Sequence, residues 1–219
     1  MKIIKLIDVS KSFKSKKALN RVNIEFYNNR ISGLLGPNGS GKTTLFNIIA
    51  GFLSPDLGKI LLDGNNLYNK SLNQRTRLGI SYLPQEASIF RDLSVYDNIF
   101  SIAELFHNKI NSIKVTSNLV KQFSLNNFQK TKGKLLSGGE RRRTEIARAL
   151  ASNPKFLLLD EPFAGIDPIA IEEVKSTISL LKKMNIGVII TDHNVKEALS
   201  IVDYGLSLIH ISEPTRPLS

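Results

Sequence analysis

Short apolar runs bounded by glycine, proline and asparagine recur along the chain. Residues 3–9 (IIKLIDV) and 22–27 (VNIEFY) alternate partly between apolar and polar side chains, and residues 31–36 (ISGLLG) form a continuous apolar run. Similar short runs occupy residues 58–64 (GKILLDG) and 79–85 (GISYLPQ). Alternation and short apolar runs between turn residues are typical of β-strands. The first part of the chain is therefore predicted to be rich in strands.

The final third of the chain alternates buried strands with helices. Residues 155–162 (KFLLLDEP) and 187–193 (GVIITDH) are continuous apolar runs, as expected of parallel strands covered on both faces. Asp167 and Pro168 suit the first positions of a helix between these two strands. Residues 194–203 (NVKEALSIVD) predict a last helix. This order indicates an α/β domain with a parallel sheet.

Helical patterns dominate residues from about 87 to 152. Ser94, with Asp97 three residues later, predicts the start of a helix over 95–106, and a lysine-rich helix is predicted at about 112–124. The stretch 136–153 is also predicted to be helical. We interpret this block as a helical subdomain inserted into the α/β domain. No internal repeat or low-complexity linker interrupts the chain.

Composition excludes several classes of site. The 219 residues include no cysteine and only three histidines, which excludes disulfides, thiol catalysis and cysteine-ligated zinc. No apolar run reaches the roughly 18 residues that a membrane-spanning helix needs, and the start resembles no signal peptide. A cytoplasmic protein is therefore expected. The net charge of +11 would suit nucleic acid, but a lysine-rich composition is the preferred explanation, and no nucleic-acid partner is expected.

The strongest local motif is GPNGSGKT, which fits the pattern GxxxxGK[ST] between a predicted strand and a predicted helix at 42–50 that ends at Gly51. Glycines allow successive backbone N–H groups to surround phosphate oxygens, and the helix N-terminus adds positive potential. Lys42 is expected to reach the β- and γ-phosphates and the Thr43 hydroxyl to bind Mg²⁺. The residues predicted to bind the nucleotide here are Gly36, Pro37, Asn38, Gly39, Ser40, Gly41, Lys42, Thr43 and Thr44.

Two further motifs have the chemistry of ATP hydrolysis. Asp160 and Glu161 follow a buried strand, where Asp160 can hold Mg²⁺ through water and Glu161 can polarise the attacking water. In LSGGE, Ser137 and Glu140 suit a capping box at a helix start. Gly138 and Gly139 weaken that helix by roughly 1 kcal/mol each. Glycines at such a position make sense if bare N–H groups must approach an anion.

With these motifs, residues 1 to about 205 resemble the ATP-binding-cassette (ABC) family of ATPases. GPNGSGKT matches the family's Walker A motif, LSGGE its signature motif, and FLLLDE its Walker B motif. The resemblance implies a P-loop fold with a RecA-like parallel core, an N-terminal antiparallel β subdomain and a helical subdomain. It also implies ATP and Mg²⁺ as ligands and a head-to-tail dimer, either homodimeric, as we expect, or heterodimeric. Ser137, Gly138 and Gly139 would then contact ATP bound by the partner chain.

The resemblance also assigns roles to single residues. Gln85 lies at the position of the family's Q-loop glutamine and would sense Mg²⁺ and nucleotide. His193 lies at the position of the switch histidine and would contact the γ-phosphate and orient the water. Phe13 lies where an aromatic ring stacks on adenine, for which the ring alone suffices. The predicted catalytic residues are thus Lys42, Gln85, Glu161 and His193, and the predicted metal-binding residues are Thr43, Gln85 and Asp160.

Residues 79–98 (GISYLPQEASIFRDLSVYDN) resemble the ATPase subunits of lipopolysaccharide-export transporters. This implies two transmembrane permease subunits, peripheral attachment to the inner membrane, and docking of the permeases around Phe90 and Arg91. Two alternatives stay open: an ATPase of branched-chain amino-acid importers, and a soluble ABC ATPase acting on nucleic acid or the ribosome. A degenerate regulatory cassette is disfavoured because every catalytic motif is intact.

The end of the chain departs from the family pattern. Residues 206–219 (LSLIHISEPTRPLS) stand where the family continues with a strand, a turn and a helical end. Pro214 and Pro217 disfavour a regular helix or central strand. The string resembles translated sequencing-adaptor read-through, so we expect it to be non-native. The alternative is a genuine divergent tail.

Overall fold

The computed structural model describes residues 1–14, 16–37, 39–165 and 167–207. Its strands are β1 (Ile3–Phe13), β2 (Lys16–Tyr27), β3 (Ile31–Leu35), β4 (Leu57–Leu62), β5 (Asn65–Asn66), β6 (Ile80–Leu83), β7 (Phe156–Asp160), β8 (Gly187–Thr191) and β9 (Tyr204–Ser207). Its α-helices are α1 (Lys42–Ala50), α2 (Leu72–Leu78), α3 (Val95–Phe106), α4 (Lys109–Gln122), α5 (Gly138–Leu150), α6 (Pro168–Lys183) and α7 (Val195–Leu199). Two short 3₁₀ helices, η1 (Asn126–Phe128) and η2 (Gly133–Leu135), precede α5.

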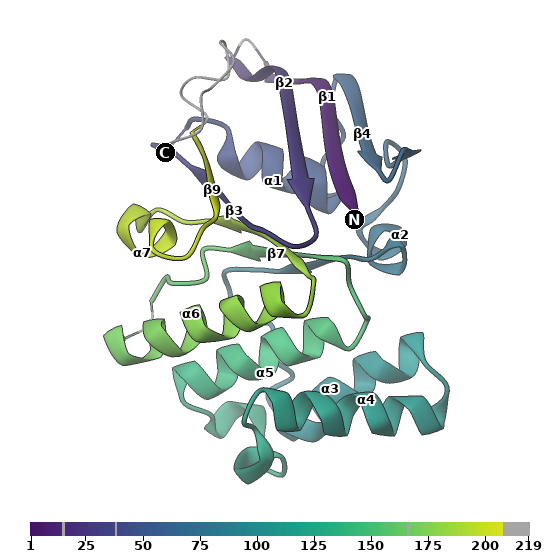
Figure 1. Cartoon of the computed structure of the whole chain (residues 1–219), viewed down its shortest axis with the longest axis vertical. Coiled ribbons are helices and arrows are strands. Elements are labelled where there is room, and N and C mark those ends of the chain that lie inside the picture. Colours follow the sequence, from purple (N-terminus) through teal and green to yellow (C-terminus); the bar gives the residue numbers. More distant parts are fainter. Residues whose placement is uncertain (15, 38, 166, 208–219) are drawn as a thin grey trace.

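The strands form two sheets, and helix α1 packs between them (Figure 1). One sheet is antiparallel with the strand order β2-β1-β4-β5, and the other has the order β6-β7-β8-β3-β9. All pairs in the second sheet are parallel. The parallel α/β core, the N-terminal antiparallel sheet and the helical block all match the predicted architecture.

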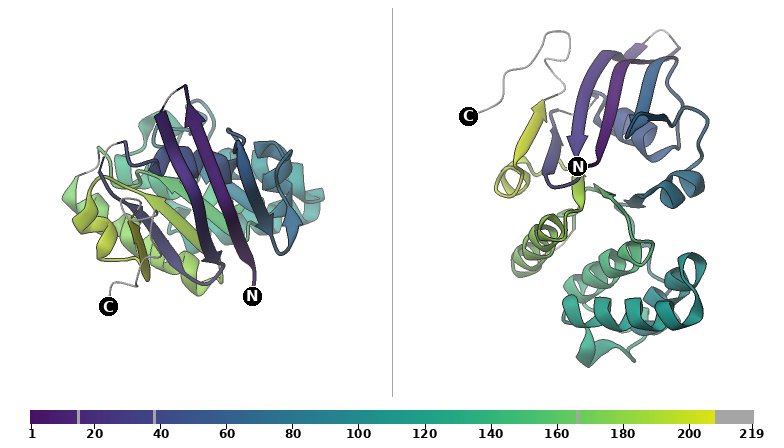
Figure 2. Two further views of the ribbon diagram at one scale, coloured as in Figure 1. Left: turned by 90° about the horizontal axis from the view of Figure 1, so that it is seen from above. Right: turned by 45° about the vertical axis from the view of Figure 1, so that its right-hand side comes forward.

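The parallel sheet is buried on both faces because its strands are apolar at successive positions. Leu158 and Ile189 pack with α1 and the antiparallel sheet in one core. Leu157 and Leu159 point the other way, into a second core shared with helices α3 to α6. This explains why residues 155–162 carry no polar alternation. Helices α3, α4 and α5 form the end of the molecule farthest from the antiparallel sheet (Figure 2).

Local capping explains where several helices begin and end. Ser94 accepts a hydrogen bond from the Asp97 backbone N–H, and Ser137 and Glu140 form a complete capping box at the start of α5. Asp167 caps α6, and Pro168 is its first residue. Helix α1 ends at Gly51, whose φ of 94° is the left-handed conformation that favours glycine. These four predictions are confirmed.

A buried arginine fixes the C-terminal end of α1. The Arg75 guanidinium, 1 % exposed, donates to the carbonyl oxygens of Lys70 (2.8 Å), Ile48 (2.6 Å), Ile49 (2.8 Å) and Leu67 (2.7 Å). Burial lowers the pKa of Arg75 to about 10, so the group stays charged at neutral pH. Its positive charge lies against the negative end of the α1 dipole. Arg75 therefore ties α2 and the loop before it to α1.

Several predicted boundaries differ from the structure. Helix α4 begins at Lys109, earlier than predicted, because Asn108 caps it. Helix α2 was absent from the sequence prediction although Ser71 and Gln74 form a capping box there. The last helix covers only Val195–Leu199. Leu206 and Ser207 of the expected non-native tail pair with Leu34 and Leu35 in the parallel sheet, and the rest of the tail lies outside the described residues.

No helix in the described part of the chain combines the length and apolar character needed to cross a bilayer.

Candidate functional site

The carboxyl ends of four parallel strands meet at one edge of the sheet. In the strand register, Leu34 of β3 pairs with Thr191 of β8, and Thr191 pairs with Asp160 of β7. Leu83 of β6 pairs with Leu159 of β7. The segments that leave these ends carry the glycine-rich loop, Gln85, the Asp160–Glu161 pair and His193. Parallel pairing therefore gathers motifs that lie far apart in the sequence.

The glycine-rich loop adopts backbone conformations that favour glycine. Gly36, Gly39 and Gly41 have φ values of 143°, 81° and 94°. A Cβ at Gly41 would also lie 2.5 Å from the Ala18 carbonyl oxygen, too close for any side chain. The loop can therefore turn sharply into α1 with its backbone N–H groups free to face an anion. Asn38, predicted to bind nucleotide, lies outside the described residues.

Two polar side chains, Ser40 and Lys42, lie where this loop enters α1. The Lys42 ammonium donates to the carbonyl oxygens of Gly36 (2.6 Å) and Pro37 (2.9 Å), so it lies over the loop rather than in solvent. The buried hydroxyl oxygen of Ser40 has no hydrogen-bond partner among the described residues. A buried hydroxyl without a partner is uncommon in folded proteins. Thr43 and Thr44 lie in the first turn of α1, with Thr43 exposed.

Phe13 lies near this loop through the β1–β2 pairing. Phe13, the last residue of β1, pairs with Lys16 of β2, and the Lys16 ammonium is 3.8 Å from where a Cβ at Gly39 would stand. The Phe13 ring is 49 % exposed. An aromatic ring so exposed is available to stack on a flat partner.

Asp160 is held by two hydroxyl groups. Its Oδ1 accepts a 2.6 Å hydrogen bond from Thr191, and its Oδ2 accepts a longer one, 3.4 Å, from the Tyr82 hydroxyl. Burial and the nearby Asp160 charge raise the pKa of Tyr82 to about 12, so Tyr82 stays protonated and can donate. Sequence reasoning missed Tyr82 and Thr191. The two hydroxyl groups thus fix the orientation of the carboxylate.

Glu161 and His193 face one another across the strand ends. The Glu161 Oε2 lies 3.2 Å from the His193 Nδ1. Glu161 has a φ of 43°, a left-handed conformation that costs a side-chain-bearing residue roughly 1–3 kcal/mol, and its backbone N–H donates to the Thr191 carbonyl. Such strain is characteristic of functional positions.

A buried aspartate that the sequence analysis missed joins the segments carrying Glu161 and His193. Asp192 is 1 % exposed, and its Oδ2 accepts a hydrogen bond from the Phe163 backbone N–H at 3.1 Å. Its Oδ1 accepts one from the Asn194 N–H at 2.7 Å. Only its position beside His193 in the sequence could have drawn attention to it.

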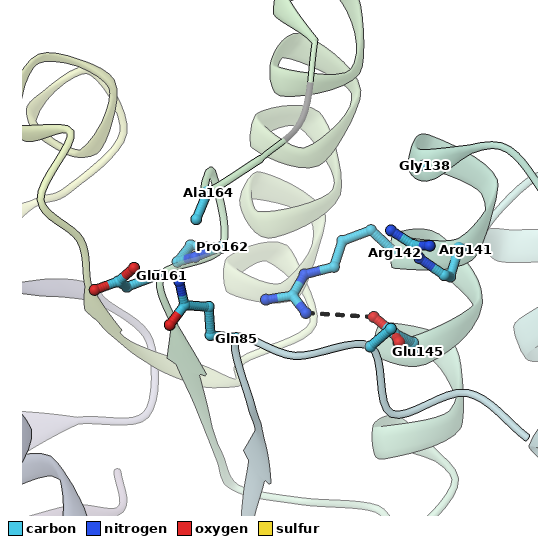
Figure 3. A pocket seen from close by; sticks show the side chains of 9 residues that line it. Gln85, Gly138, Arg141, Arg142, Glu145, Glu161, Pro162 and Ala164 are labelled. Atoms are coloured by element: carbon cyan, nitrogen blue, oxygen red, sulfur yellow. Dashed lines mark hydrogen bonds and ion pairs between the residues drawn. The ribbon is translucent and has the colours of Figure 1, made fainter.

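The LSGGE helix lies on the other side of the parallel sheet from α1 (Figure 1). Within the described ranges, no hydrogen bond or ion pair joins Ser137, Gly138 or Gly139 to the glycine-rich loop. Gly138 instead borders a small pocket that Gln85 and Glu161 also line (Figure 3). The structure thus brings Gln85, Asp160, Glu161 and His193 to the strand ends that also carry the glycine-rich loop, whereas Ser137 and Gly139 lie at the start of α5 and Phe90 and Arg91 on the loop before α3.

Phe90 and Arg91 are exposed on the loop between β6 and α3. Phe90 is 47 % exposed, and its backbone N–H and carbonyl both bond the buried Asn98 side chain, at 2.8 and 3.0 Å. Asn98 also donates to the carbonyl of Leu93 at 3.3 Å. Sequence reasoning missed Asn98. The loop that presents Phe90 is therefore held in one shape by a side chain of α3.

Comparison with known proteins agrees with this geometry. The model of the ABC transporter family matches residues 19–164. The lipopolysaccharide export system ATP-binding protein LptB of Haemophilus influenzae is 45 % identical over 205 residues, which cover 93 % of this chain and 85 % of that protein. LptB of Escherichia coli K12 is 44 % identical over 198 residues, which cover 90 % and 82 %.

Solved structures share the fold. The ADP conformation of MJ1267, an ATP-binding cassette of an ABC transporter, superposes with a TM-score of 0.84 at 28 % identity, covering 94 % of this chain and 87 % of that one. MJ0796, a dimeric cassette bound to ADP and Pi in a post-hydrolysis state, gives a TM-score of 0.79 at 25 % identity, covering 98 % and 97 %. With the family model matching more than half of its residues, the chain belongs to the ABC transporter family and has the P-loop fold of its ATP-binding cassettes.

Proposed function

We propose that this chain is the ATP-hydrolysing subunit of a transporter that extracts lipopolysaccharide from the inner membrane for export to the outer membrane. The observation that carries the hydrolytic part is the Glu161–His193 pair, 3.2 Å apart at the strand ends that also carry the glycine-rich loop and Asp160. A carboxylate beside an imidazole next to a phosphate-binding loop suits the activation of water for attack on a phosphate.

ATP would bind through the loop and the exposed ring. Backbone N–H groups from Gly36 to Thr44 would surround its phosphates, and Lys42 would exchange its two loop carbonyls for phosphate oxygens. The Ser40 hydroxyl, which has no hydrogen-bond partner among the described residues, supports this fit because a phosphate oxygen would satisfy it. Phe13 would stack on the adenine.

Magnesium would be held by Thr43, Gln85 and Asp160. Hydroxyl, amide and carboxylate oxygens are the ligands that Mg²⁺ prefers, and it keeps several waters rather than a full protein cage. When bound, the ion supplies charge neutralisation of the β- and γ-phosphates.

The remaining residues would act on the water. Glu161 would accept a hydrogen bond from the attacking water and polarise it, while His193 would contact the γ-phosphate and orient that water. The strained backbone of Glu161 and the Asp192 hydrogen bonds would keep both side chains at the strand ends. Protein groups fixed before the reaction lower the barrier without needing to reorganise.

The Ser137–Gly139 turn supports a shared site. It starts a helix on the opposite side of the sheet from α1, and its backbone N–H groups lie at the positive end of that helix. A second copy arranged head to tail would bring this turn to the γ-phosphate of the first, so that two chains form two complete sites. MJ0796, similar in fold, is dimeric in its ADP and Pi state.

The transported molecule is proposed from the relatives. Two LptB proteins that match at 44–45 % identity carry the name of the lipopolysaccharide export system. The chain would then lie on the cytoplasmic face of the inner membrane as a homodimer bound to two transmembrane permease subunits. An exposed aromatic ring beside a guanidinium suits an interface centre, so Phe90 and Arg91 would receive the permeases.

Phosphate release tests the hydrolytic part of this proposal. The purified chain should release phosphate from ATP with Mg²⁺ and should stop when EDTA removes the ion. Affinity capture from solubilised membranes should recover two membrane proteins. Phosphate release that is equal with and without Mg²⁺, or capture of ribosomes or nucleic acid that fall away steeply with salt, would contradict the proposal.

Turnover per chain should depend on protein concentration. If each site needs the Ser137–Gly139 turn of a second chain, the rate of ATP hydrolysis should rise more steeply than linearly with protein concentration. The rise should approach a quadratic dependence at concentrations where the dimer dissociates. Phosphate release measured over a dilution series, alongside sedimentation of the same samples, checks this. Strictly linear turnover by a chain that sediments as a monomer would disprove the shared site.

A further inference from the structure

One face of α5 holds the segment on either side of Gln85. Arg142, Glu145 and Arg148 are spaced three residues apart, so they lie along one face of the helix, turned toward residues 84–90. Figure 3 shows Arg142 and Glu145 reaching from α5 toward the chain that carries Gln85. The proposed function assigns these three side chains no task.

Arg142 and Glu145 form a buried ion pair that makes three hydrogen bonds to this segment. The Arg142 Nη1 donates to Glu145 Oε2 at 3.3 Å and to the Pro84 carbonyl at 3.1 Å. Glu145 Oε1 accepts hydrogen bonds from the backbone N–H groups of Ser88 at 2.7 Å and Ile89 at 3.2 Å. The two residues are 6 % and 2 % exposed. The pair therefore holds the backbone both before and after Gln85.

Arg148 extends the contact to the exposed loop. Its Nη2 donates to the Ser88 hydroxyl at 2.7 Å, and its guanidinium carbon lies 4.9 Å from the centre of the Phe90 ring. A guanidinium over a ring face attracts it electrostatically. Helix α5 is thus hydrogen-bonded to the neighbours of Gln85 and in contact with the Phe90 ring.

Stability alone does not explain why a charged pair occupies this buried position. Removing two charges from water costs about as much as their attraction returns, and apolar side chains of similar size often serve stability equally well. What apolar side chains cannot do is bond the Pro84 carbonyl and the Ser88 and Ile89 N–H groups. The pair's specific contribution is therefore the location of residues 84–89.

We propose that Arg142 and Glu145 are positioning residues. They fix Gln85, and the loop between β6 and α3 that carries Phe90, to helix α5. Gln85 would contact the ATP of its own chain, and Ser137–Gly139 would contact the ATP of the partner chain. These residues would then move as one unit with the loop that carries Phe90. This inference rests on the proposed function, since Gln85 and Ser137 act on ATP only if that proposal holds. The pair acts through the backbone of residues 84–89, to which it is hydrogen-bonded.

The test replaces both charges at once. Because removing one partner would leave a buried charge alone and endanger folding, the double variant Arg142→Met with Glu145→Met keeps the volume and loses the ties. We expect kcat to fall about tenfold with the KM for ATP within about twofold, which marks lost positioning in the transition state rather than lost ATP binding. Hydrogen exchange over residues 84–90 should accelerate, while exchange in β7 should not change.

Two further variants sharpen the result. Arg142→Met with Glu145→Gln also removes both charges but keeps an oxygen that can accept from Ser88 and Ile89, so it should retain more of kcat than the variant with two methionines. Glu172→Gln removes an exposed carboxylate that pairs with Lys175 on α6, and it should match the wild type. This control separates the loss of one negative charge from the loss of the ties.

The outcomes separate the inference from the function. Unchanged kcat in a double variant whose wild type turns over ATP would overturn the positioning role alone. A lower melting temperature without faster exchange at 84–90 would also overturn it, since the loss would then be one of general stability. If the wild type does not hydrolyse ATP, the proposed function is contradicted, and so is a role of Arg142 and Glu145 in hydrolysis. Hydrogen exchange at residues 84–90 would still test whether the hydrogen bonds of these two side chains hold the segment.

Discussion

Glu161→Gln should reduce ATP hydrolysis by about 10²- to 10⁴-fold, the usual contribution of a general base. The amide has the shape of the carboxylate and can still accept a hydrogen bond from His193, whose Nδ1 lies 3.2 Å from Glu161 Oε2. It carries no charge with which to polarise the attacking water. The local fold should therefore survive while the chemistry stops. Phosphate release at saturating ATP, compared with the wild type, measures the effect.

The same variant should still bind ATP and close. Lys42 and the glycine-rich loop are untouched, and closure of the proposed head-to-tail dimer would depend on bound ATP rather than on its cleavage. Size exclusion should show a dimer of Glu161→Gln with ATP that persists longer than the wild-type dimer. Turnover near the wild-type rate would contradict the catalytic role of Glu161. Loss of ATP binding would instead point to a structural role.

Arg75→Met should lower the free energy of unfolding by about 3–5 kcal/mol, in the range for lost buried hydrogen-bond networks. Methionine fills similar space but leaves the carbonyl oxygens of Ile48, Ile49, Leu67 and Lys70 without their guanidinium donor. Thermal or urea unfolding measures the change. A drop in Tm of about 10 °C is expected for a chain of this size.

A neighbouring arginine provides the control for this substitution. Arg77 lies on the same helix and is exposed, with its guanidinium carbon 5.7 Å from the centre of the Phe106 ring. Arg77→Met should cost no more than about 1 kcal/mol. Equal stability of the Arg75→Met and Arg77→Met variants would refute the role assigned to the buried guanidinium.

Local signals were sufficient for much of the architecture. Ser94, Ser137 and Asp167 mark helix starts through their own side chains, and continuous apolar runs mark strands buried on both faces. These features depend on neighbours in the sequence, so they can be read without the fold. The glycine-rich loop could be predicted for the same reason, and so could the carboxyl ends of the strands at 155–160 and 187–191.

What the sequence analysis missed depends on contacts between distant segments. Arg75 bonds the end of α1 from another helix, and Asn98 reaches back to the loop at Phe90. Asp192 and Tyr82 matter because β6, β7 and β8 lie side by side. Nothing in the local pattern distinguishes these polar residues from solvent-exposed ones. Helix α2 was missed because it is short, with only Arg75 buried on it.

ATP-driven release of lipopolysaccharide from vesicles tests the central proposal most directly. The chain would be co-expressed with the two membrane proteins that it captures and reconstituted into vesicles containing labelled lipopolysaccharide. We expect lipopolysaccharide to leave the membrane with ATP and Mg²⁺ for the wild-type chain, and to stay for Glu161→Gln. Vesicles that keep their lipopolysaccharide while the complex hydrolyses ATP, or that instead take up branched-chain amino acids, would contradict the account.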